Sequence, residues 1–320
     1  MTYFDVFNGD ADGICALHQL RLAEPRNSQL ITGVKRDIAL LERVNVEAGD
    51  SVTVLDISLD KNRDNLNRIL ADGASVFYAD HHFAGDIPEH EKLSTHINTD
   101  AQACTGLIIN ELLGGAYRPW AVTAAFGDNL LSTAQEAATP LNYSEQQLSK
   151  LQTLGTLLNY NGYGSQLSDL YYPPDSLYQR VQPHSDPFAF IEEDEAFVTL
   201  QNGYSDDHQR ASSIKAEQSD RNTAIFVFPN AAYARRISGV FANELAQNNP
   251  DRAHALLSEL DDGSYLVSVR APINRRTGAD ELCRQFETGG GRKAAAGINR
   301  LPASDFARFV SSMAEQFKST

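Results

Sequence analysis

The sequence has few cysteines, no long apolar run and no surplus of basic residues. Its three cysteines, Cys15, Cys104 and Cys283, are widely spaced and form no CxxC pair. This excludes a disulfide framework and a cysteine zinc site, and we expect all three to be buried as small apolar side chains. No apolar stretch is long enough to cross a membrane, and the N-terminus lacks the basic segment of a signal peptide. We therefore expect a cytoplasmic protein without a membrane partner.

Positive charge is also scarce. The chain has 27 Lys and Arg against 42 Asp and Glu, a formal net charge of −15. This is the wrong sign for a protein that holds long duplex nucleic acid by neutralising phosphates, although small or metal-assisted anionic substrates remain possible. The motifs GxGxxG after the first strand, GxxxxGK[ST], HExxH and GxSxG are absent, so the sequence supports no nicotinamide enzyme, P-loop NTPase, zincin or serine hydrolase.

The 320 residues, 42% apolar and 22% charged, are enough for two globular domains. In residues 1–139, short β-branched and aromatic runs alternate with helical patterns, which predicts an α/β fold whose parallel sheet is covered by helices on both faces. The expected strands are Tyr3–Phe7, Gln29–Thr32, Val52–Leu55, Ser75–Tyr78 and Thr95–Ile97. The expected helices are Ile14–Ala23, Lys61–Ala71, Thr105–Leu113 and Trp120–Ser132.

The pattern changes twice in the rest of the chain. Residues 140–205 contain a stretch rich in Tyr, Pro and Asn between helical pieces, which we interpret as linker helices with an insertion. Residues 206–320 predict a smaller α/β domain. Its expected elements are strands Thr223–Phe228 and Tyr265–Arg270, helices Tyr233–Ala246 and Ser304–Phe317, a hairpin at 261–263 and a glycine-rich turn at Gly289–Gly291.

Carboxylates follow three of the predicted strands. Asp10 and Asp12 come after the first strand, Asp56 follows Val52–Leu55, and Asp80 with two histidines follows the next strand. Residues just past the carboxyl ends of parallel strands line one crevice, so we expect these acids to converge. A single Asp after a strand is more often a helix N-cap, and Asp12 ahead of Ile14–Ala23 could be one. The coincidence at three strand ends favours a shared site.

Converging carboxylates repel one another unless a strong positive charge lies among them. Oxygen ligands mixed with imidazole suit Mn²⁺, with Mg²⁺ and other divalent ions as competitors. Asp128, on or just after a predicted helix, is a candidate for a further ligand. Four aspartates and one histidine around two divalent ions would give a charge near zero, the setting of two-metal hydrolysis.

These residues carry a family resemblance. The segments NGDADG (8–13), LD (55–56), DHH (80–82) and GD (127–128) resemble the four ordered motifs of the DHH phosphoesterase superfamily. GGGRKAAAG (289–297) is similar to the glycine-rich signature of the companion DHHA1 domain, commonly GGGHxxAAG. The resemblance implies an N-terminal DHH domain that binds metal and a C-terminal DHHA1 domain that binds substrate.

The resemblance also implies roles for single residues. Two divalent ions, Mn²⁺ first and Mg²⁺ or Co²⁺ as alternatives, would be held by Asp10, Asp12, Asp56, His81 and Asp128, with Asp56 between them. Asp80 would orient the site, and His82 would face the scissile phosphate or the leaving group. The chain departs from the family pattern at two positions: Val6 stands where many members have a histidine, and Arg292 replaces the histidine of the glycine-rich signature.

The glycine-rich segment is the candidate phosphate site. Backbone N–H groups of Gly289, Gly290 and Gly291 can approach an anion closely, and a following helix would direct its positive end toward it. Arg270, Arg292 and Lys293 would complete the cradle. Two further groups are less informative: the tyrosines Tyr160, Tyr163, Tyr171 and Tyr172 could stack on bases but more often cover an interface, and His208 with Arg235 and Arg236 is interpreted as solvated surface.

We therefore expect a metal-dependent phosphodiesterase, or oligoribonuclease, that acts on short linear 5′-phosphorylated nucleotides. Dinucleotides such as pGpG or pApA, cleaved to 5′-mononucleotides, fit the acidic chain best, and an oligomer is possible. One alternative is a RecJ-like single-strand exonuclease, which would need a basic groove. The other is a non-catalytic nucleotide-binding protein, against which the complete set of acids and histidines argues.

Overall fold

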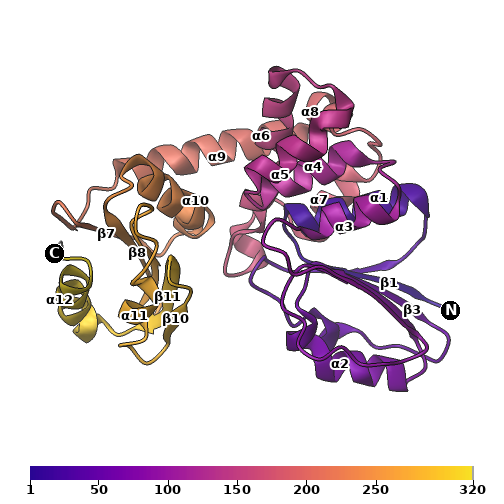
Figure 1. Cartoon of the computed structure of the whole chain (residues 1–320), viewed down its shortest axis with the longest axis horizontal. Coiled ribbons are helices and arrows are strands. Elements are labelled where there is room, and N and C mark those ends of the chain that lie inside the picture. The colour runs from indigo at the N-terminus through magenta and orange to yellow at the C-terminus, as the bar shows by residue number, and fades with distance from the viewer. Residues whose placement is uncertain (319–320) are drawn as a thin grey trace. The chain divides into compact units, whose positions relative to one another are not determined.

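The computed structural model describes residues 1–318 and divides the chain into two compact units (Figure 1). The first unit is Met1–Gly203 and the second begins at Tyr204, inside helix α9 (Glu195–Ser213). Each unit is built on its own β-sheet. None of the described helices is long and apolar enough to cross a membrane.

The first unit contains the expected parallel sheet. Its strands lie in the order β2-β1-β3-β4-β5, and every neighbouring pair is parallel. The carboxyl ends of all five strands therefore lie at one edge of the sheet. The strands are β1 (Tyr3–Phe7), β2 (Gln29–Ile31), β3 (Ser51–Leu55), β4 (Ser75–Asp80) and β5 (Leu93–Ile97).

Helices cover both faces of this sheet, as expected (Figure 1). Alternate residues of β1 point to opposite faces: Phe4 and Val6 join an apolar core with helix α2 (Leu59–Ala71) and the 3-10 turn η1 (Leu40–Arg43). On the other face, the Asp5 carboxylate forms a buried ion pair with Arg21 of α1 (Ala11–Ala23). Helices α3 (Thr105–Leu112) and α4 (Arg118–Gly127) pack beside α1.

The helix expected at Trp120–Ser132 is in fact two helices. Helix α4 ends at Gly127, and α5 spans Leu131–Ala138. Between them Asn129 has a left-handed backbone with φ of +61°, a conformation that asparagine tolerates better than most residues. The break places Asp128 at the end of α4 instead of inside a helix.

Residues 140–205 are mostly helical. They form the 3-10 turns η2 (Thr139–Leu141) and η3 (Leu167–Asp169), and helices α6 (Glu145–Gly162), α7 (Pro174–Val181), α8 (Pro187–Glu193) and the first part of α9. Helix α6 packs on α4 and α1. Its Gly155 permits the contact, since a Cβ there would lie 2.4 Å from the Thr123 carbonyl oxygen.

The second unit is a six-stranded mixed sheet in the order β10-β11-β9-β8-β7-β6, in which only the β7 and β8 pair is parallel. Helix α10 packs on β8 and β9, while the side chains of α11 and α12 share an apolar core with the strands. The elements are β6 (Gln218–Ser219), β7 (Thr223–Phe228), α10 (Ala232–Asn248), β8 (Ala253–Glu259), β9 (Tyr265–Arg270), α11 (Ala279–Cys283), β10 (Gly289–Gly291), β11 (Ala295–Leu301), η4 (Ala303–Asp305) and α12 (Phe306–Gln316).

The hairpin expected at 261–263 joins β8 to β9, which pair antiparallel. Two features of this unit differ from expectation. Gly289–Gly291 is strand β10 instead of a turn, and strand β11 follows it instead of a helix. Gly297 lets β11 approach β9, because a Cβ there would lie 2.7 Å from the Val267 carbonyl oxygen.

Candidate metal centre

Asp10 begins helix α1 at the carboxyl edge of the first sheet. Its Oδ1 accepts hydrogen bonds from the backbone N–H groups of Asp12 and Gly13, at 3.1 and 3.2 Å. Asp10 is therefore the N-cap of α1. Gly13 allows this tight turn, since a Cβ there would lie 2.2 Å from the Asn8 carbonyl oxygen.

Asp12 has a different partner helix. Its two carboxylate oxygens accept the backbone N–H groups of Thr105 and Gly106, each at 2.7 Å, at the start of α3. The alternative that Asp12 caps the helix of its own segment is therefore wrong. Because the side chain is fully buried and held at both oxygens, α3 fixes the position of this carboxylate in the site.

Asp56 follows β3 with φ of +58°, a left-handed conformation that is uncommon for aspartate. The side chain is buried, and its Oδ1 lies 3.4 Å from the Thr105 hydroxyl. A residue held in this strained conformation at a strand end is a feature of functional sites.

The two histidines after β4 have different surroundings. His81 Nε2 lies 3.4 Å from Asp56 Oδ1, 3.5 Å from Asp128 Oδ2 and 3.9 Å from Asp12 Oδ2. His82 Nδ1 instead lies 2.7 Å from Oδ1 of the buried Asp80. His81 is therefore at the centre of the acids, while Asp80 orients the neighbouring ring.

Lys35 belongs to the same site, and the sequence analysis did not identify it. It follows β2, and its Nζ lies 2.5 Å from Asp10 Oδ2, 3.7 Å from Asp128 Oδ1 and 2.7 Å from Asn159 Oδ1. The same ammonium lies 5.4 Å from the centre of the Tyr163 ring. The signal was available, because the strand-end argument applies to a lysine after β2 as it does to the acids.

The electrostatics of the cluster favour the binding of a cation. Burial raises the pKa of Asp56 well above its usual range, and the charges of Asp12, Asp10 and Asp128 add to the effect. Burial and the same kind of repulsion raise the pKa of Asp128 to about 8. For Asp10, burial acts in the same direction, but the Lys35 ammonium outweighs it and lowers the pKa. Lys35 thus compensates Asp10 and leaves the other acids repelling one another.

The donor set fits divalent metal ions. Asp12, His81 and Asp128 present ligand atoms within 4.8 Å of one another, and so do Asp56, His81 and His82. Carboxylate oxygens with imidazole nitrogens suit Mn²⁺ or Mg²⁺, and a bound cation would relieve the repulsion that raises the pKa of Asp56. Asp10 is outside both groups and is paired with Lys35.

The glycine-rich segment of the second unit forms part of a sheet edge. Gly289 packs against the backbone, since a Cβ there would lie 1.7 Å from the Cys283 carbonyl oxygen, and Gly291 has φ of +138°. Arg292 and Lys293 occupy the turn between β10 and β11 and are exposed. Arg270, at the end of β9, donates to Asn243 of α10 and to Ser268. The expected helix dipole is absent because β11 follows the turn, so any anion would depend on the side chains and the backbone of this turn.

The remaining candidates are placed as follows. Cys15, Cys104 and Cys283 are buried, as expected. Tyr160 is fully buried against Tyr171, so base stacking by Tyr160 is wrong. The interpretation of residues 208 and 235–236 as solvated surface is wrong for Arg236, which is buried in an ion pair with Asp207. His208 is partly exposed, and its Nε2 lies 2.6 Å from Glu244 Oε2.

Comparison with solved structures identifies the fold. The chain superimposes on an exonuclease RecJ bound to manganese with a TM-score of 0.56 at 16% identity, covering 100% of this chain and 91% of that one. It superimposes on the pGpG-specific phosphodiesterase PggH from Vibrio cholerae with a TM-score of 0.56 at 15% identity, covering 99% of both chains. A RecJ from Thermus thermophilus in complex with Mn²⁺ gives a TM-score of 0.55 at 14% identity, over 52% of its own length. No family model and no curated protein matches the sequence.

Proposed function

We propose that this chain, which shares the two-domain α/β fold of RecJ and PggH, is a divalent-metal-dependent phosphodiesterase that hydrolyses short linear 5′-phosphorylated oligonucleotides to 5′-mononucleotides. Dinucleotides such as pGpG or pApA are the proposed substrates, and Mn²⁺ is the proposed ion. The observation that carries the proposal is the convergence of Asp12, Asp56 and Asp128 on His81 at one sheet edge.

The residues of the site have different proposed roles. The metals would be held by Asp12, Asp56, His81 and Asp128. Asp10 would become a further ligand if Lys35 moved away from it or if its carboxylate contacted Lys35 and a metal together. Divalent ions held there would supply the acidity that activates a water and positive charge beside the reacting phosphate. The hydrogen bond that the His82 ring donates to the Asp80 carboxylate raises the pKa of His82, against the opposing effect of partial desolvation, and this favours the protonated ring. His82 is then suited to donate its Nε2 proton to the leaving oxygen.

Lys35 adds a permanent charge beside the acids. Its ammonium contacts Asp10 and Asp128, and the side chain is one-quarter exposed. It can therefore donate to a non-bridging phosphate oxygen while remaining close to Asp10. In the second unit, Arg270, Arg292, Lys293 and the backbone of Gly289, Gly290 and Gly291 are the proposed contacts to the terminal phosphate.

Two observations support a short substrate. The net charge is −15, and the chain matches PggH over 99% of both lengths, whereas it spans about half of the Thermus RecJ. The RecJ-like alternative, exonuclease action on longer single strands, is favoured by the equal similarity to a RecJ of nearly the same length. The two proposals differ in how the rate depends on substrate length.

The deciding experiment measures kcat/KM with Mn²⁺ and with Mg²⁺ on 5′-phosphorylated oligomers of two to ten nucleotides and on cyclic dinucleotides. The proposal expects rapid cleavage of pGpG or pApA, a marked decline by four or five nucleotides and little cleavage of the rings. Rates that stay level or rise with length would establish the RecJ-like activity instead. Absence of cleavage of every substrate with either metal would leave the non-catalytic alternative.

A further inference from the structure

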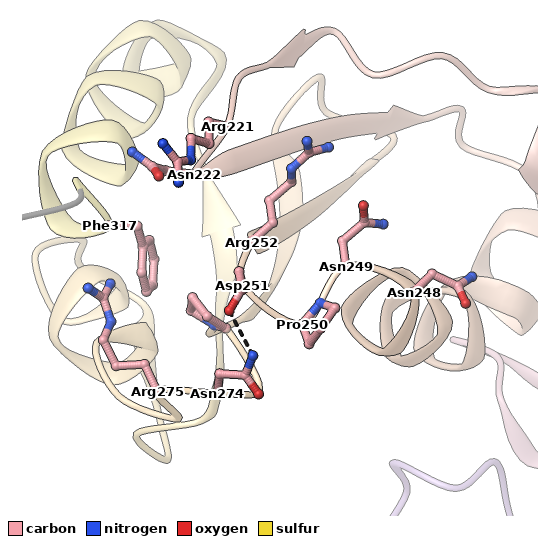
Figure 2. Close-up of a pocket in the computed structure, with 11 residues that line it drawn as sticks. Arg221, Asn222, Asn248, Asn249, Pro250, Asp251, Arg252, Asn274, Arg275 and Phe317 are labelled. Carbon is pink, nitrogen blue, oxygen red and sulfur yellow. Dashed lines mark hydrogen bonds between the residues drawn. The ribbon is translucent and has the colours of Figure 1, made fainter.

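A polar pocket of about 620 Å³ lies at one edge of the second sheet. Three separate segments line it: residues 221–222 before β7, residues 248–252 before β8 and residues 272–275 after β9. The sheet topology brings them together, because β7 and β8 start at the same edge and antiparallel β9 ends there. Figure 2 shows Arg221, Arg252 and Arg275 arranged around this pocket.

The pocket collects positive charge in an acidic chain. The exposed Arg221 has no hydrogen bond or ion pair among the described residues. The Nε of Arg252 is buried without an acceptor in the same part of the chain, and its Nη1 reaches only Ser219 at 3.5 Å. Arg275 lies over the Phe317 ring at 5.6 Å. These guanidinium groups have N–H donors to spare.

The acids beside the arginines are already hydrogen bonded. Asp251 accepts from the Asn274 amide at 2.7 Å, the dashed contact in Figure 2. Asp220 accepts the backbone N–H groups of Asn222 and Thr223, each at 2.7 Å. Neither acid forms an ion pair within 4.0 Å of an arginine in the described part of the chain. The lining holds three arginines and one acid, Asp251, so it carries a net positive charge, and the nearby Asp220 carboxylate interacts electrostatically with Arg252.

The same sheet edge carries the glycine-rich turn. Ala295 of β11 pairs with Arg270 of β9, which pairs with His254 of β8. The turn with Arg292 and Lys293 and the pocket with Arg252 therefore lie along one edge. Three strand spacings separate β11 from β7, about 14 Å. The pocket therefore adjoins the turn through the segment after β9, where the Ala271 N–H donates to the Ala294 carbonyl oxygen, and it extends from there to Arg221 before β7.

We propose that this pocket is a second nucleotide site, in which Arg221, Arg252 and Arg275 bind phosphate oxygens. Guanidinium groups bind phosphate in bidentate fashion, and the volume is in the range of small-molecule sites. The amides of Asn222 and Asn248 supply donors and acceptors for a base edge or a ribose hydroxyl. The occupant is a nucleotide, free or within a strand that continues from the glycine-rich turn. The site extends the proposed function and does not depend on hydrolysis.

Equilibrium dialysis of the full chain in EDTA tests binding without turnover. The probes are AMP, a 5′-phosphorylated adenosine tetranucleotide and inorganic phosphate. Arg221→Gln and Arg252→Gln are compared with Arg300→Gln, which removes the same charge from β11 near the opposite end of the strands. We expect the first two to weaken AMP or tetranucleotide binding about tenfold and the control to change it less than twofold. The salt slope of tetranucleotide binding should also fall by about one.

The comparison of probes shows whether the site binds a free nucleotide or part of a strand. A loss of one bound AMP per chain indicates a free nucleotide, and a loss confined to the tetranucleotide indicates the distal part of a strand. Both support the site. Arg221 is exposed, so its variant should fold, and it decides the matter if Arg252→Gln lowers the melting temperature. If Arg221→Gln binds AMP and the tetranucleotide as tightly as Arg300→Gln does, the proposal is wrong.

Discussion

The Lys35 ammonium lies 2.5 Å from Asp10 Oδ2, within the group of acids that the sequence assigns to metal ions. Lys35 comes from the loop after β2 and Asp10 from the loop after β1, and these neighbouring parallel strands end at the same edge. The pair keeps both groups charged, since each shifts the pKa of the other toward its charged form even though burial opposes this. A built-in cation therefore balances one buried carboxylate in the absence of metal.

Replacing this lysine should destabilise the metal-free protein. In Lys35→Met the apolar stem is kept, but the buried Asp10 loses its counter-charge, which should cost about 2 kcal/mol of unfolding free energy. Mn²⁺ should then raise the melting temperature more than in the wild type, because the bound ion supplies the positive charge that Asp10 has lost. Thermal unfolding in EDTA and in Mn²⁺ measures both effects. The control is Lys150→Met, which breaks an exposed pair with Glu192; equal behaviour of the two variants would contradict the prediction.

Asp56→Asn should have opposite effects on activity and stability. The metals would lose a central ligand, so the rate should fall more than tenfold, over about 1.4 kcal/mol of barrier. The metal-free protein should be as stable as the wild type or more stable, because a buried carboxylate that repels Asp12 and Asp10 is removed. Steady-state kinetics and denaturation in EDTA test the two halves. A smaller loss of rate, or full activity in chelator, would refute the two-metal mechanism.

Phe83 is a candidate residue for stacking on a substrate base. It follows His82 directly and is 74% exposed, so its ring is accessible to a ligand bound beside the acids. Base stacking contributes about 1–3 kcal/mol, so Phe83→Ala should raise KM for the dinucleotide about tenfold or more, with a smaller change in kcat. Ile87→Ala is the matched control, because Ile87 is an exposed apolar residue of the same loop. Equal KM values for both variants would show that Phe83 does not contact substrate.

Arg270→Ala and Arg292→Ala should weaken the use of 5′-phosphorylated substrates. A hydrogen bond to a charged phosphate contributes about 1.5–3 kcal/mol, so kcat/KM should fall roughly tenfold to a hundredfold. Dinucleotides without the 5′-phosphate should lose much less. Because Arg270 also donates to Asn243, an equal loss on both substrates would indicate a structural role for that residue.

The stability of the first unit should depend on pH through the titration of His18. Burial lowers its pKa to about 4, from an ordinary value of 6.5. Between pH 4 and pH 6.5, His18 is therefore protonated in the unfolded chain and neutral in the folded protein. The free energy of unfolding should therefore be highest above pH 6.5. It should decline by about 3 kcal/mol as the pH falls through 4, because the unfolded chain then gains a proton that the folded protein does not bind.

His18→Gln removes this proton linkage while keeping a donor for the His184 carbonyl oxygen. The difference in unfolding free energy between wild type and variant should therefore shrink or reverse as the pH falls from 6.5 to 4. The exposed His90 provides the control variant, His90→Gln. Parallel curves for wild type and His18→Gln over this range would show that His18 does not titrate differently on folding.

The sequence by itself determined the parallel sheet and the candidate ligands. The strands around Asp10, Asp56 and Asp80 are short runs of apolar, β-branched and aromatic residues, and side-chain period and burial are local properties of such runs. The rule that parallel strands end at one edge then predicted that the acids lie close together. The buried cysteines followed from composition in the same way.

Tertiary structure decided what depends on partners far along the chain. Asp12 caps α3 instead of α1 because the N–H groups of Thr105 and Gly106, over ninety residues away, reach its carboxylate. Lys35 lies in the site because β2 pairs with β1, a pairing that the local sequence does not specify. The net charge of the chain did not predict that Arg221 and Arg252 lie at the same sheet edge, because a total charge does not say where the charged residues are in the fold. Local patterns set each element, and only the packing of the elements set which charges face one another.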